Sequence, residues 1–571
     1  MKFKRLGDML TSTGMITEEQ LKVALNKQRD TKNRLGKELI EEGVISEEQL
    51  IHTLKLQLGL DSIDLSTVNI PSALSEIIPK KMANNYGLVP VKQEGDSLYV
   101  AMSDPLNFVA LEDVKAVSKK RIIPLIATEE SIQRNIGSLY GNEGAARAIE
   151  EMKREMNDAP AAVIFGDSFL SNNIDNDEQS APTIRLVNSL IERAVSERAS
   201  DIHIEPAENE VRVRMRIDGL LRQIMIVPKD LQSSVISRLK IMGGMDITER
   251  RIPQDGRSNA KVKKADIDLR MSTLPTIYGE KLVIRLLDKN TQLLDKAKIG
   301  LTGEDLEKYM RLINQKGGGV VLIAGPTGSG KSSTLYTMIR ELNTEQSNLI
   351  TLEDPVEYNI AGINQVQINE KTGMTFSGGL RAILRQDPDI IAVGEIRDGE
   401  TAEIAMRAAI TGHLVLSTIH TNSSIATLDR LLDIGVEPYL ISSALNGVVS
   451  QRLVRRICPH CRKEYEPTQE ELASIGLSHE NHGFYHGEGC PMCFGTGYRG
   501  RVAVFEILVM DRKVKNAISS GAKREELAEI IHSHKGFVAL ADNCRRLVLE
   551  GVTTVEEAKR ITNSEDYEYE S

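Results

Sequence analysis

The chain has 571 residues, 41% of them hydrophobic and 27% charged, so its composition is that of a globular protein with roughly three or four domains. No run approaches about 18 apolar residues, and the first residues lack the apolar core of a signal peptide, so a cytosolic chain is predicted. A net charge of −10, no Trp and 4% aromatic residues argue against binding a nucleic-acid polymer by charge or by base stacking.

The amino-terminal residues form a tandem repeat, in which residues 5–28 and 34–57 match each other at a spacing of 29. Each copy is predicted to be a short helix, a glycine and a second helix that begins with a capping box, at Thr17–Gln20 and at Ser46–Gln49. A duplicated helical hairpin with its own core explains the leucines at helical spacing. It does not explain the Arg ahead of each Leu-Gly, and two related sites with an Arg each suit a ligand with two phosphates and two flat bases.

The repeated pattern Arg-Leu-Gly, followed by Leu, Gly, Leu, Leu and Gln, resembles the amino-terminal cyclic-di-GMP-binding domain of MshE-type pilus ATPases. This resemblance implies an α+β domain over residues 1–140, with strand-like stretches at 88–91 and 97–102. It also implies that Asp104 closes over the ligand. The other implied contacts of cyclic-di-GMP are Arg5, Leu6, Gly7, Leu25, Gln28, Arg34, Leu35, Gly36, Leu54 and Gln57.

Residues 141–181 are predicted to be a linker, because their later part is polar, acidic and rich in Asn, and a helix is expected at about 144–156. Beyond Pro182 a helical pattern is followed by strands. In Val211–Gly219 apolar and basic residues alternate, which predicts a half-buried strand with one basic face. That face is either solvated or carries arginines to a nucleotide held by a neighbouring subunit.

The segment Gly325–Ser332 fills every fixed position of the pattern G-x-x-x-x-G-K-[ST], between an apolar run at 320–324 and a helical stretch at 334–342. A strand, a glycine loop and a helix direct backbone N–H groups and a helix dipole at phosphates. Lys331 would reach the β- and γ-phosphates, and Ser332 would ligate Mg²⁺. A glycine turn with a chance lysine is the alternative, which the flanking pattern disfavours. The predicted ATP-binding residues are Gly325, Pro326, Thr327, Gly328, Ser329, Gly330, Lys331, Ser332 and Ser333.

Three further motifs lie at the ends of predicted buried strands. Strand 350–353 leads into carboxylates that could hold Mg²⁺ or orient the attacking water, although a solvated turn also carries acids. Strand 390–393 leads into a Gly-Glu pair, and two histidines flank a short apolar strand in 411–422, which suits a γ-phosphate sensor better than a structural role. The candidate residues are Glu353, Asp354, Glu357, Glu395, His413 and His420.

In this order after the P-loop, the three motifs resemble the Asp box, Walker B and His box of the type II secretion and type IV pilus ATPase superfamily. The resemblance implies a multidomain α/β protein with a RecA-like P-loop ATPase core over residues 290–571 and a PAS-like α+β middle domain over residues 182–289.

The same resemblance implies residue roles. Glu395 would belong to the Mg²⁺ shell with Ser332, and Glu357 would be the general base, supported by Glu353 and Asp354; the sequence does not separate the two roles. Two histidines would sense phosphate or carry a signal between subunits, namely His413 and His420. An Arg from the middle domain of a neighbouring subunit would stabilise the transition state, and the choices in order are Arg270 and Arg285, then Arg257 and Arg216.

Two Cys-x-x-Cys pairs, Cys458/Cys461 and Cys490/Cys493, bound a module over residues 458–493. In a cytosolic chain such pairs indicate a metal site rather than disulfides, and four thiolates can hold a structural Zn²⁺. Four free thiols in a loop are the alternative. Pilus-extension and type II secretion ATPases carry such an insertion and retraction ATPases generally lack it, so the resemblance implies assembly rather than retraction.

As a whole, the resemblance implies a cytoplasmic homohexamer, peripheral to the inner membrane, that hydrolyses ATP to polymerise type IV pilin under the control of cyclic-di-GMP. The expected partners are an inner-membrane platform protein and cytosolic pilus-alignment proteins. A type II secretion ATPase that drives pseudopilus assembly shares every motor motif and is the nearest alternative. A DNA-translocating motor is disfavoured by the acidic charge, and a nucleotide-gated scaffold without turnover by the complete set of acids. The acidic residues 565–570 are expected to be disordered.

Overall fold

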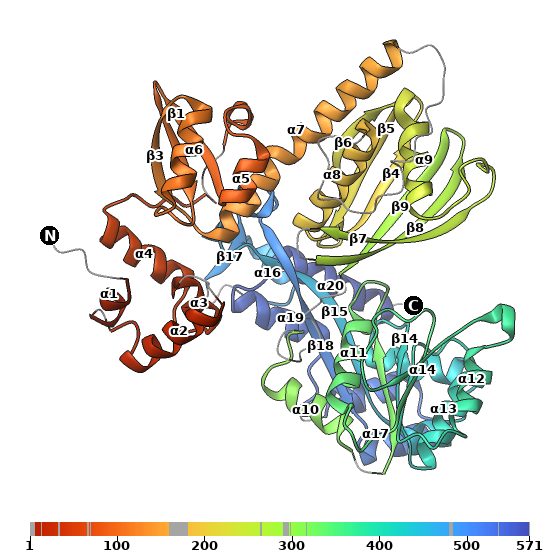
Figure 1. Cartoon of the computed structure of the whole chain (residues 1–571). Coiled ribbons are helices and arrows are strands. Elements are labelled where there is room, and N and C mark those ends of the chain that lie inside the picture. The colour runs from red at the N-terminus through yellow and green to blue at the C-terminus, as the bar shows by residue number, and fades with distance from the viewer. Residues whose placement is uncertain are drawn as a thin grey trace. The chain divides into compact units, whose positions relative to one another are not determined.

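The computed structural model describes residues 6–569 apart from 13, 32–34, 66, 67, 69, 159–180, 263, 264, 289–295, 297, 298, 316, 479–482 and 535. The chain divides into two compact units, residues 1–288 with 489–496 and residues 289–488 with 497–571 (Figure 1). In the described part of the chain, no helix combines the length and the hydropathy that crossing a bilayer requires.

The tandem repeat folds into four helices, α1 (Leu6–Ser12), α2 (Glu18–Thr31), α3 (Leu35–Glu41) and α4 (Glu47–Leu58). Both predicted capping boxes are confirmed. The Thr17 and Gln20 side chains accept hydrogen bonds from each other's backbone N–H at 3.2 and 2.8 Å. Ser46 and Gln49 do the same at 3.2 and 2.9 Å. These reciprocal bonds satisfy N–H groups at the start of a helix, which is why such local patterns predict helix boundaries well.

The glycine that follows each Arg-Leu pair has a packing role. A Cβ on Gly7 would lie 2.9 Å from a methyl group of Leu21, and a Cβ on Gly36 would lie 2.8 Å from a methyl group of Leu50. The short helix of each copy therefore approaches its long helix through a glycine. Helix packing thus accounts for the repeated Gly without a ligand.

The rest of the amino-terminal region is a three-stranded sheet in the order β1-β2-β3 with helices around it. The strands predicted at 88–91 and 97–102 are confirmed as parts of β1 and β2. The elements are η1 (Ser72–Glu76), α5 (Lys80–Tyr86), β1 (Leu88–Glu94), β2 (Ser97–Met102), α6 (Phe108–Ser118), β3 (Arg121–Ile126) and α7 (Glu129–Asp158).

Helix α7 corrects the predicted linker. It runs from Glu129 to Asp158, so the first part of the segment 141–181 is helical, and the helix expected at about 144–156 is the second half of a longer one. Its first half buries Ile132 and Ile136 in the core of the three-stranded sheet, and its second half buries Ala148 in the next core. The helix continues because it has apolar partners on both halves. The rest of the predicted linker, 159–180, lies outside the described residues.

The middle domain is a six-stranded antiparallel sheet in the order β6-β5-β4-β9-β8-β7. Helices α8 and α9 cover one face through a shared core (Figure 1). On β5 the apolar residues are buried and the arginines between them are not, which confirms the predicted basic face. The elements are α8 (Pro182–Ser196), β4 (Ala199–Pro206), β5 (Glu210–Ile217), β6 (Leu220–Pro228), η3 (Lys229–Leu231), α9 (Gln232–Met242), β7 (Gln254–Val262), β8 (Ala265–Thr276) and β9 (Gly279–Asp288).

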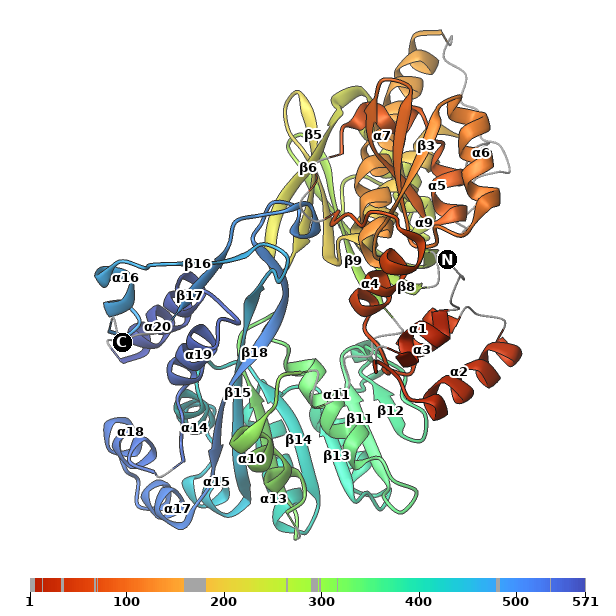
Figure 2. The same ribbon diagram turned by 90° about the vertical axis from the view of Figure 1, so that its left-hand side faces the viewer.

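The second unit is built on a seven-stranded sheet in the order β12-β11-β13-β14-β10-β15-β18 (Figure 2). All neighbours are parallel except β18, which is antiparallel to β15. Its elements up to the cysteine module are α10 (Gly303–Ile313), β10 (Gly319–Ala324), α11 (Lys331–Leu342), β11 (Leu349–Glu353), β12 (Asn364–Gln367), η4 (Glu370–Thr372), α12 (Phe376–Ile383), β13 (Ile390–Val393), α13 (Gly399–Ile410), β14 (Leu414–Ile419), α14 (Ser424–Asp433), α15 (Pro438–Ala444) and β15 (Leu445–Ile457).

Both faces of this sheet are covered. Alternate residues of β10 illustrate the arrangement: Val320 and Leu322 belong to the core formed with α12–α15, whereas Val321 and Ile323 belong to the core formed with α10 and α11. A parallel sheet between two helical layers is the predicted RecA-like core, and the multidomain α/β class is confirmed.

The carboxyl-terminal part surrounds the long β15–β18 pair. Helix α20 corrects one prediction, because it continues to Tyr569 through most of the acidic residues expected to be disordered. Its first turns are anchored by buried Val555 and Ala558, from which the helix extends. The elements are β16 (Arg462–Tyr465), α16 (Gln469–Ala473), β17 (Phe484–Gly487), η5 (Pro491–Cys493), β18 (Tyr498–Val509), α17 (Arg512–Ser519), α18 (Arg524–His532), α19 (Leu540–Leu549) and α20 (Val555–Tyr569).

Candidate nucleotide-binding and catalytic site

The motor motifs meet at one edge of the parallel sheet. Neighbouring strands end in register: Ala324 at the end of β10 pairs with Ile419 at the end of β14, and Val393 at the end of β13 pairs with Leu352 of β11. The loops that follow these strands therefore lie side by side. They contain the P-loop, His420 with the residues after it, the Gly394-Glu395 turn and the acidic loop 353–357.

The P-loop turns sharply after β10. Gly325 has a φ of +151°, and a Cβ there would lie 2.4 Å from Ser329 Oγ and 2.6 Å from the carbonyl oxygen of Gln451, so only glycine fits. Helix α11 begins at Lys331, which directs its free N–H groups at the loop. Thr327, Gly328 and Ser332 are exposed and Ser333 is half-buried, so solvent reaches the loop.

Lys331, His420 and Glu395 form a contiguous polar cluster beside this loop. The Nζ of Lys331 lies 3.5 Å from Nδ1 of His420, and Nε2 of His420 lies 3.1 Å from a carboxylate oxygen of Glu395. The other carboxylate oxygen of Glu395 pairs with Arg397. The structure thus brings together three residues that the sequence supplied in separate motifs. Arg397 was missed, although its place two residues after Glu395 in the Gly-Glu-Ile-Arg segment was a visible signal.

Lys331 is nine-tenths buried, and its Nζ donates to the carbonyl oxygens of Gly325 and Pro326 at 2.8 and 3.1 Å. Burial lowers the pKa of Lys331 to about 8, an effect that Glu395 opposes and Arg452 reinforces. The ammonium group is therefore close to losing its proton within the range of ordinary assays.

This pKa predicts how ATP affinity depends on pH. Below about pH 8 Lys331 is already charged, whereas above about pH 8 the neutral form dominates and phosphate binding must restore the proton. The Kd for ATP should rise by up to about tenfold per pH unit above that value, with uptake of about one proton per site. Calorimetry at pH values on either side, in buffers of different ionisation enthalpy, measures both quantities. In the control Lys331→Arg the guanidinium stays charged, so a similar proton uptake there would refute the assignment.

The three carboxylates of the acidic loop, those of Glu353, Asp354 and Glu357, lie in different environments. Glu353 is buried and fully engaged: Oε2 accepts from the Tyr336 hydroxyl, and Oε1 accepts from Thr351 Oγ1 at 2.5 Å and from Gln365 Nε2 at 3.0 Å. Asp354 is exposed and Glu357 is half-buried. The structure therefore places Glu353 among protein groups rather than at the open edge.

The two histidines lie at opposite ends of β14. His420 follows the strand and reaches Lys331, whereas His413 precedes it and contacts the carbonyl oxygen of Ala408 at 2.9 Å through Nδ1. At about 3.3 Å per residue, the strand separates them by roughly 20 Å. His413 is therefore not part of the cluster at the P-loop.

One residue next to the P-loop was missed by the motif search. The buried amide of Gln451, on β15, accepts from Thr334 Oγ1 at 2.7 Å and donates to the carbonyl oxygen of Ser329 at 2.8 Å. It joins the loop to a strand more than a hundred residues later, so no local pattern signals it.

The middle-domain arginines form a row across its open face. Arg257, Arg270 and Arg285 are successive cross-strand neighbours on β7, β8 and β9, and the row continues through Asp201 on β4 to Arg216 on β5. Arg285 Nε donates to Asp201 at 3.1 Å, and Arg216 Nε lies 3.7 Å from the same carboxylate. In-register neighbours project from one face of a sheet, so the four arginines named as candidates share the face opposite α8 and α9.

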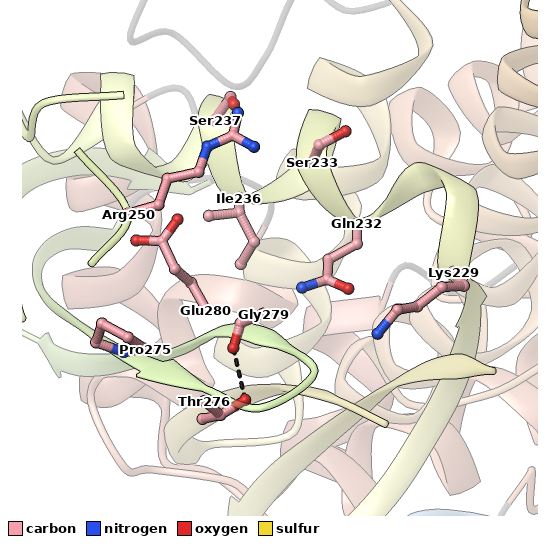
Figure 3. Close-up of a pocket in the computed structure, with 10 residues that line it drawn as sticks. All are labelled: Lys229, Gln232, Ser233, Ile236, Ser237, Arg250, Pro275, Thr276, Gly279 and Glu280. Carbon is pink, nitrogen blue, oxygen red and sulfur yellow. Dashed lines mark hydrogen bonds between the residues drawn. The ribbon is translucent and has the colours of Figure 1, made fainter. Parts of the chain in front are cut away.

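A pocket of about 270 Å³ lies in the middle domain between α9 and the β8–β9 turn (Figure 3). Two of its charged residues already have partners inside the domain. Lys229 Nζ donates to the carbonyl oxygens of Ala207 and Tyr278 at 2.5 and 2.8 Å, and Glu280 forms an ion pair with the buried Lys240. No residue predicted from the sequence as catalytic or ligand-binding lines this pocket.

The four paired cysteines form one cluster. Their sulfur atoms all lie within 4.8 Å of one another, with Cys458 and Cys493 buried. The sulfur atoms of Cys490 and Cys493 are 3.7 Å apart. A tetrahedral Zn²⁺ with Zn–S bonds of about 2.3 Å requires sulfur atoms about 3.8 Å apart, so the cluster fits such an ion.

The predicted cyclic-di-GMP residues are only partly described. Arg5 and Arg34 and the side chain of Gln57 lie outside the described residues. The pair Leu25 and Leu54 is not symmetric, since Leu25 is 40% exposed and Leu54 is buried. Leu6, Leu35 and Gln28 are half-buried, Gly7 and Gly36 are buried, and Asp104 accepts a hydrogen bond from the Leu106 N–H at 3.2 Å.

Comparison with known proteins identifies relatives along the chain. A family model described as type II/IV secretion system protein matches residues 176–560, and a model of the MshEN domain matches residues 58–146, which leaves the tandem repeat outside it. The type IV pilus assembly ATPase PilB of Thermus thermophilus is 42% identical over 97% of this chain, which spans 65% of that protein's length. The protein of the same name from Myxococcus xanthus is 41% identical over 97% of this chain and 98% of its own.

Secretion proteins match nearly as well. The type II secretion system protein E of Pseudomonas aeruginosa is 39% identical over 88% of this chain and 99% of its own length. Among solved structures, the ATPase DotB of Legionella pneumophila has a TM-score of 0.51 and 20% identity, covering 69% of this chain and 99% of its own, which shows a shared fold. With its motor motifs assembled at one sheet edge, the chain belongs to the type II/IV secretion system family of ATPases.

Proposed function

We propose that this protein hydrolyses ATP to drive the polymerisation of type IV pilin at the inner membrane, as a cytoplasmic homohexamer held there by an inner-membrane platform protein and pilus-alignment proteins. The observation that carries the proposal is the cluster of Lys331, His420 and Glu395 beside a complete P-loop. The matches of two type IV pilus assembly ATPases to 97% of the chain support pilus assembly as the process that the ATPase drives.

Deletion of the gene tests the proposal. Cells should lose surface pili and regain them with the wild-type gene but not with Lys331→Ala, while secreted enzymes are unaffected. Type II secretion is the second candidate, because the secretion protein of Pseudomonas aeruginosa is 39% identical. Loss of secreted enzymes with pili intact would establish that candidate instead.

The site residues divide the chemistry by position. Lys331 and the N–H groups at the start of α11 would bind the β- and γ-phosphates, with Gly325–Ser333 enclosing them. Ser332 and Glu395 would hold Mg²⁺, which neutralises phosphate charge when bound. Of the acids, Glu357 would be the general base; the occupation of Glu353 by protein donors and the exposure of Asp354 support this choice. His420 would sense the γ-phosphate through Lys331 and Glu395.

The arginine row supports a site shared between subunits. Four guanidinium groups lie along one open sheet face, where Asp201 pairs with Arg285 and Asp268 pairs with Arg270 at 3.4 Å, so the row has more guanidinium groups than carboxylate partners. We assign Arg270 and Arg285 to the transition state of the neighbouring subunit's ATP. A hexameric ring would present this face to the P-loop of the next protomer.

We also propose that the amino-terminal region binds cyclic-di-GMP. The tandem helical repeat and the MshEN match over residues 58–146 support it. Calorimetry on the full chain should show binding that is lost in both Arg5→Ala and Arg34→Ala but kept in Lys22→Ala, an exposed control on α2. Unchanged binding in the two Arg variants would remove these residues from the ligand site.

The cysteine cluster is proposed to hold a structural Zn²⁺, with Cys458, Cys461, Cys490 and Cys493 as ligands. Four thiolates leave no open coordination position, so the ion would stabilise the module rather than act in hydrolysis. Metal analysis of the purified chain should find about one zinc per protomer, and a chain free of zinc with full thermal stability would contradict the assignment.

A further inference from the structure

Tyr336 connects the helix that carries the P-loop lysine to the loop that carries the acids. We propose that Tyr336 is a positioning residue, which sets the place of the Glu357 carboxylate by holding the backbone of the acidic loop against α11. This inference rests on the proposed role of Glu357 as the general base.

The hydroxyl group of Tyr336 uses its full bonding capacity on this loop. It donates to Glu353 and accepts from the backbone N–H groups of Glu357 and Tyr358 at 3.1 and 3.3 Å. One donor and two acceptor positions are all that a phenol offers. Tyr336 is 2% exposed, and its ring meets the Tyr358 ring edge-on, with centroids 5.3 Å apart. This packing fixes the position of the Tyr336 hydroxyl.

The Tyr336 hydroxyl keeps its proton. Burial and the hydrogen bond to Glu353 raise the pKa of Tyr336 above its ordinary value, so the hydroxyl stays protonated and donates at neutral pH. The bond to Glu353 is therefore not a titrating switch but a fixed link.

A second residue holds the other side of the same loop. Gln365 donates to Glu353 at 3.0 Å and to the Tyr358 carbonyl at 2.9 Å, and it accepts from the Ile360 N–H at 2.8 Å. Removal of the Tyr336 hydroxyl would thus leave the loop attached through Gln365. The bonds to Glu353 and to the Glu357 and Tyr358 N–H groups would be lost, and of these the Glu357 N–H is the anchor nearest the Glu357 carboxylate.

The position of Tyr336 gives this link a function. It lies five residues after Lys331 on the same helix, and its partner Glu353 ends β11 beside the Gly394 turn. The phosphate-binding lysine and the acidic loop are thereby held to one rigid element. A general base must lie within hydrogen-bond reach of the attacking water, and a displacement of about 1 Å costs up to about 10²-fold in rate.

The test compares Tyr336→Phe, which removes only the hydroxyl, with Tyr358→Phe. The Tyr358 hydroxyl makes no hydrogen bond with any described residue, so Tyr358→Phe controls for the loss of a phenol hydroxyl next to Tyr336. Tyr336→Phe should lower kcat by about 10- to 100-fold with the ATP Kd within about twofold, while Tyr358→Phe stays near wild type. Tyr336→Phe with wild-type kcat, or with the loss in ATP binding, would overturn the proposal.

Combination with Glu357→Gln separates positioning from a structural effect. If Tyr336 acts through Glu357, Tyr336→Phe should cost less than about twofold in the Glu357→Gln background. Equal losses in both backgrounds would overturn the inference. A fully active Glu357→Gln variant would instead refute the proposed role of Glu357. A normal Tyr336→Phe beside an impaired Glu357→Gln would sink the inference and leave the proposed function intact.

Discussion

Replacement of both Arg270 and Arg285 by alanine should slow ATP hydrolysis by about 10³- to 10⁵-fold, the range over which a transition-state arginine contributes to phosphoryl transfer. ATP binding should be nearly unchanged, because the arginines act on charge that develops during the reaction. The measurement is single-turnover hydrolysis, with the enzyme in excess of ATP and at a concentration above the Kd for ATP. Arg212→Ala is the matched control, since this exposed arginine is on β5, in the same sheet, but pairs with Glu210.

Mixing variants tests whether the site is shared between protomers. The double Arg variant keeps its P-loop, and Lys331→Ala keeps its arginines, so neither alone should turn over ATP. In randomly mixed rings made from equal amounts, about a quarter of the interfaces would combine an intact P-loop with intact arginines. Recovered hydrolysis on mixing is expected, and a mixture as inactive as its parts would show that the arginines act within their own protomer or not at all.

Glu357→Gln should lower kcat by about 10²- to 10⁴-fold, the usual contribution of a positioned general base. Its amide cannot accept the proton of the attacking water, yet it keeps the volume of the side chain, so ATP should still bind. Glu395→Gln should differ, because the loss of a carboxylate from the Mg²⁺ shell weakens Mg²⁺ binding. A higher Mg²⁺ concentration should then be needed for half-maximal activity. Mg²⁺ titrations of both variants in steady-state assays measure the contrast.

An exposed acid serves as the control for this pair. Glu345 is exposed in the turn that follows α11, and Glu345→Gln should leave both kcat and the Mg²⁺ requirement near wild type. If Glu357→Gln and Glu395→Gln instead shift the Mg²⁺ requirement equally, both carboxylates hold the metal and the base lies elsewhere.

Short-range patterns explain what could be predicted. The capping boxes at Thr17 and Ser46 depend on groups within a few residues of one another, and so does the close approach of Gly325 to Ser329, so their chemistry is visible in the chain itself. The cysteine pairs are similar, since each pair needs only one tight turn. The length of α7 was missed for the opposite reason: its first half is set by apolar partners in a distant core.

By itself, the sequence determined that this protein carries a phosphate-binding loop with acids and histidines after it, because those segments are local. Which groups meet was decided by the tertiary structure. Strand direction puts His420 at the phosphate edge and His413 at the other, and the pleat of β11 turns Glu353 inward to Tyr336. The arginine row likewise depends on the register of five strands, and a linear pattern does not contain the hydrogen-bonded pairing that sets it.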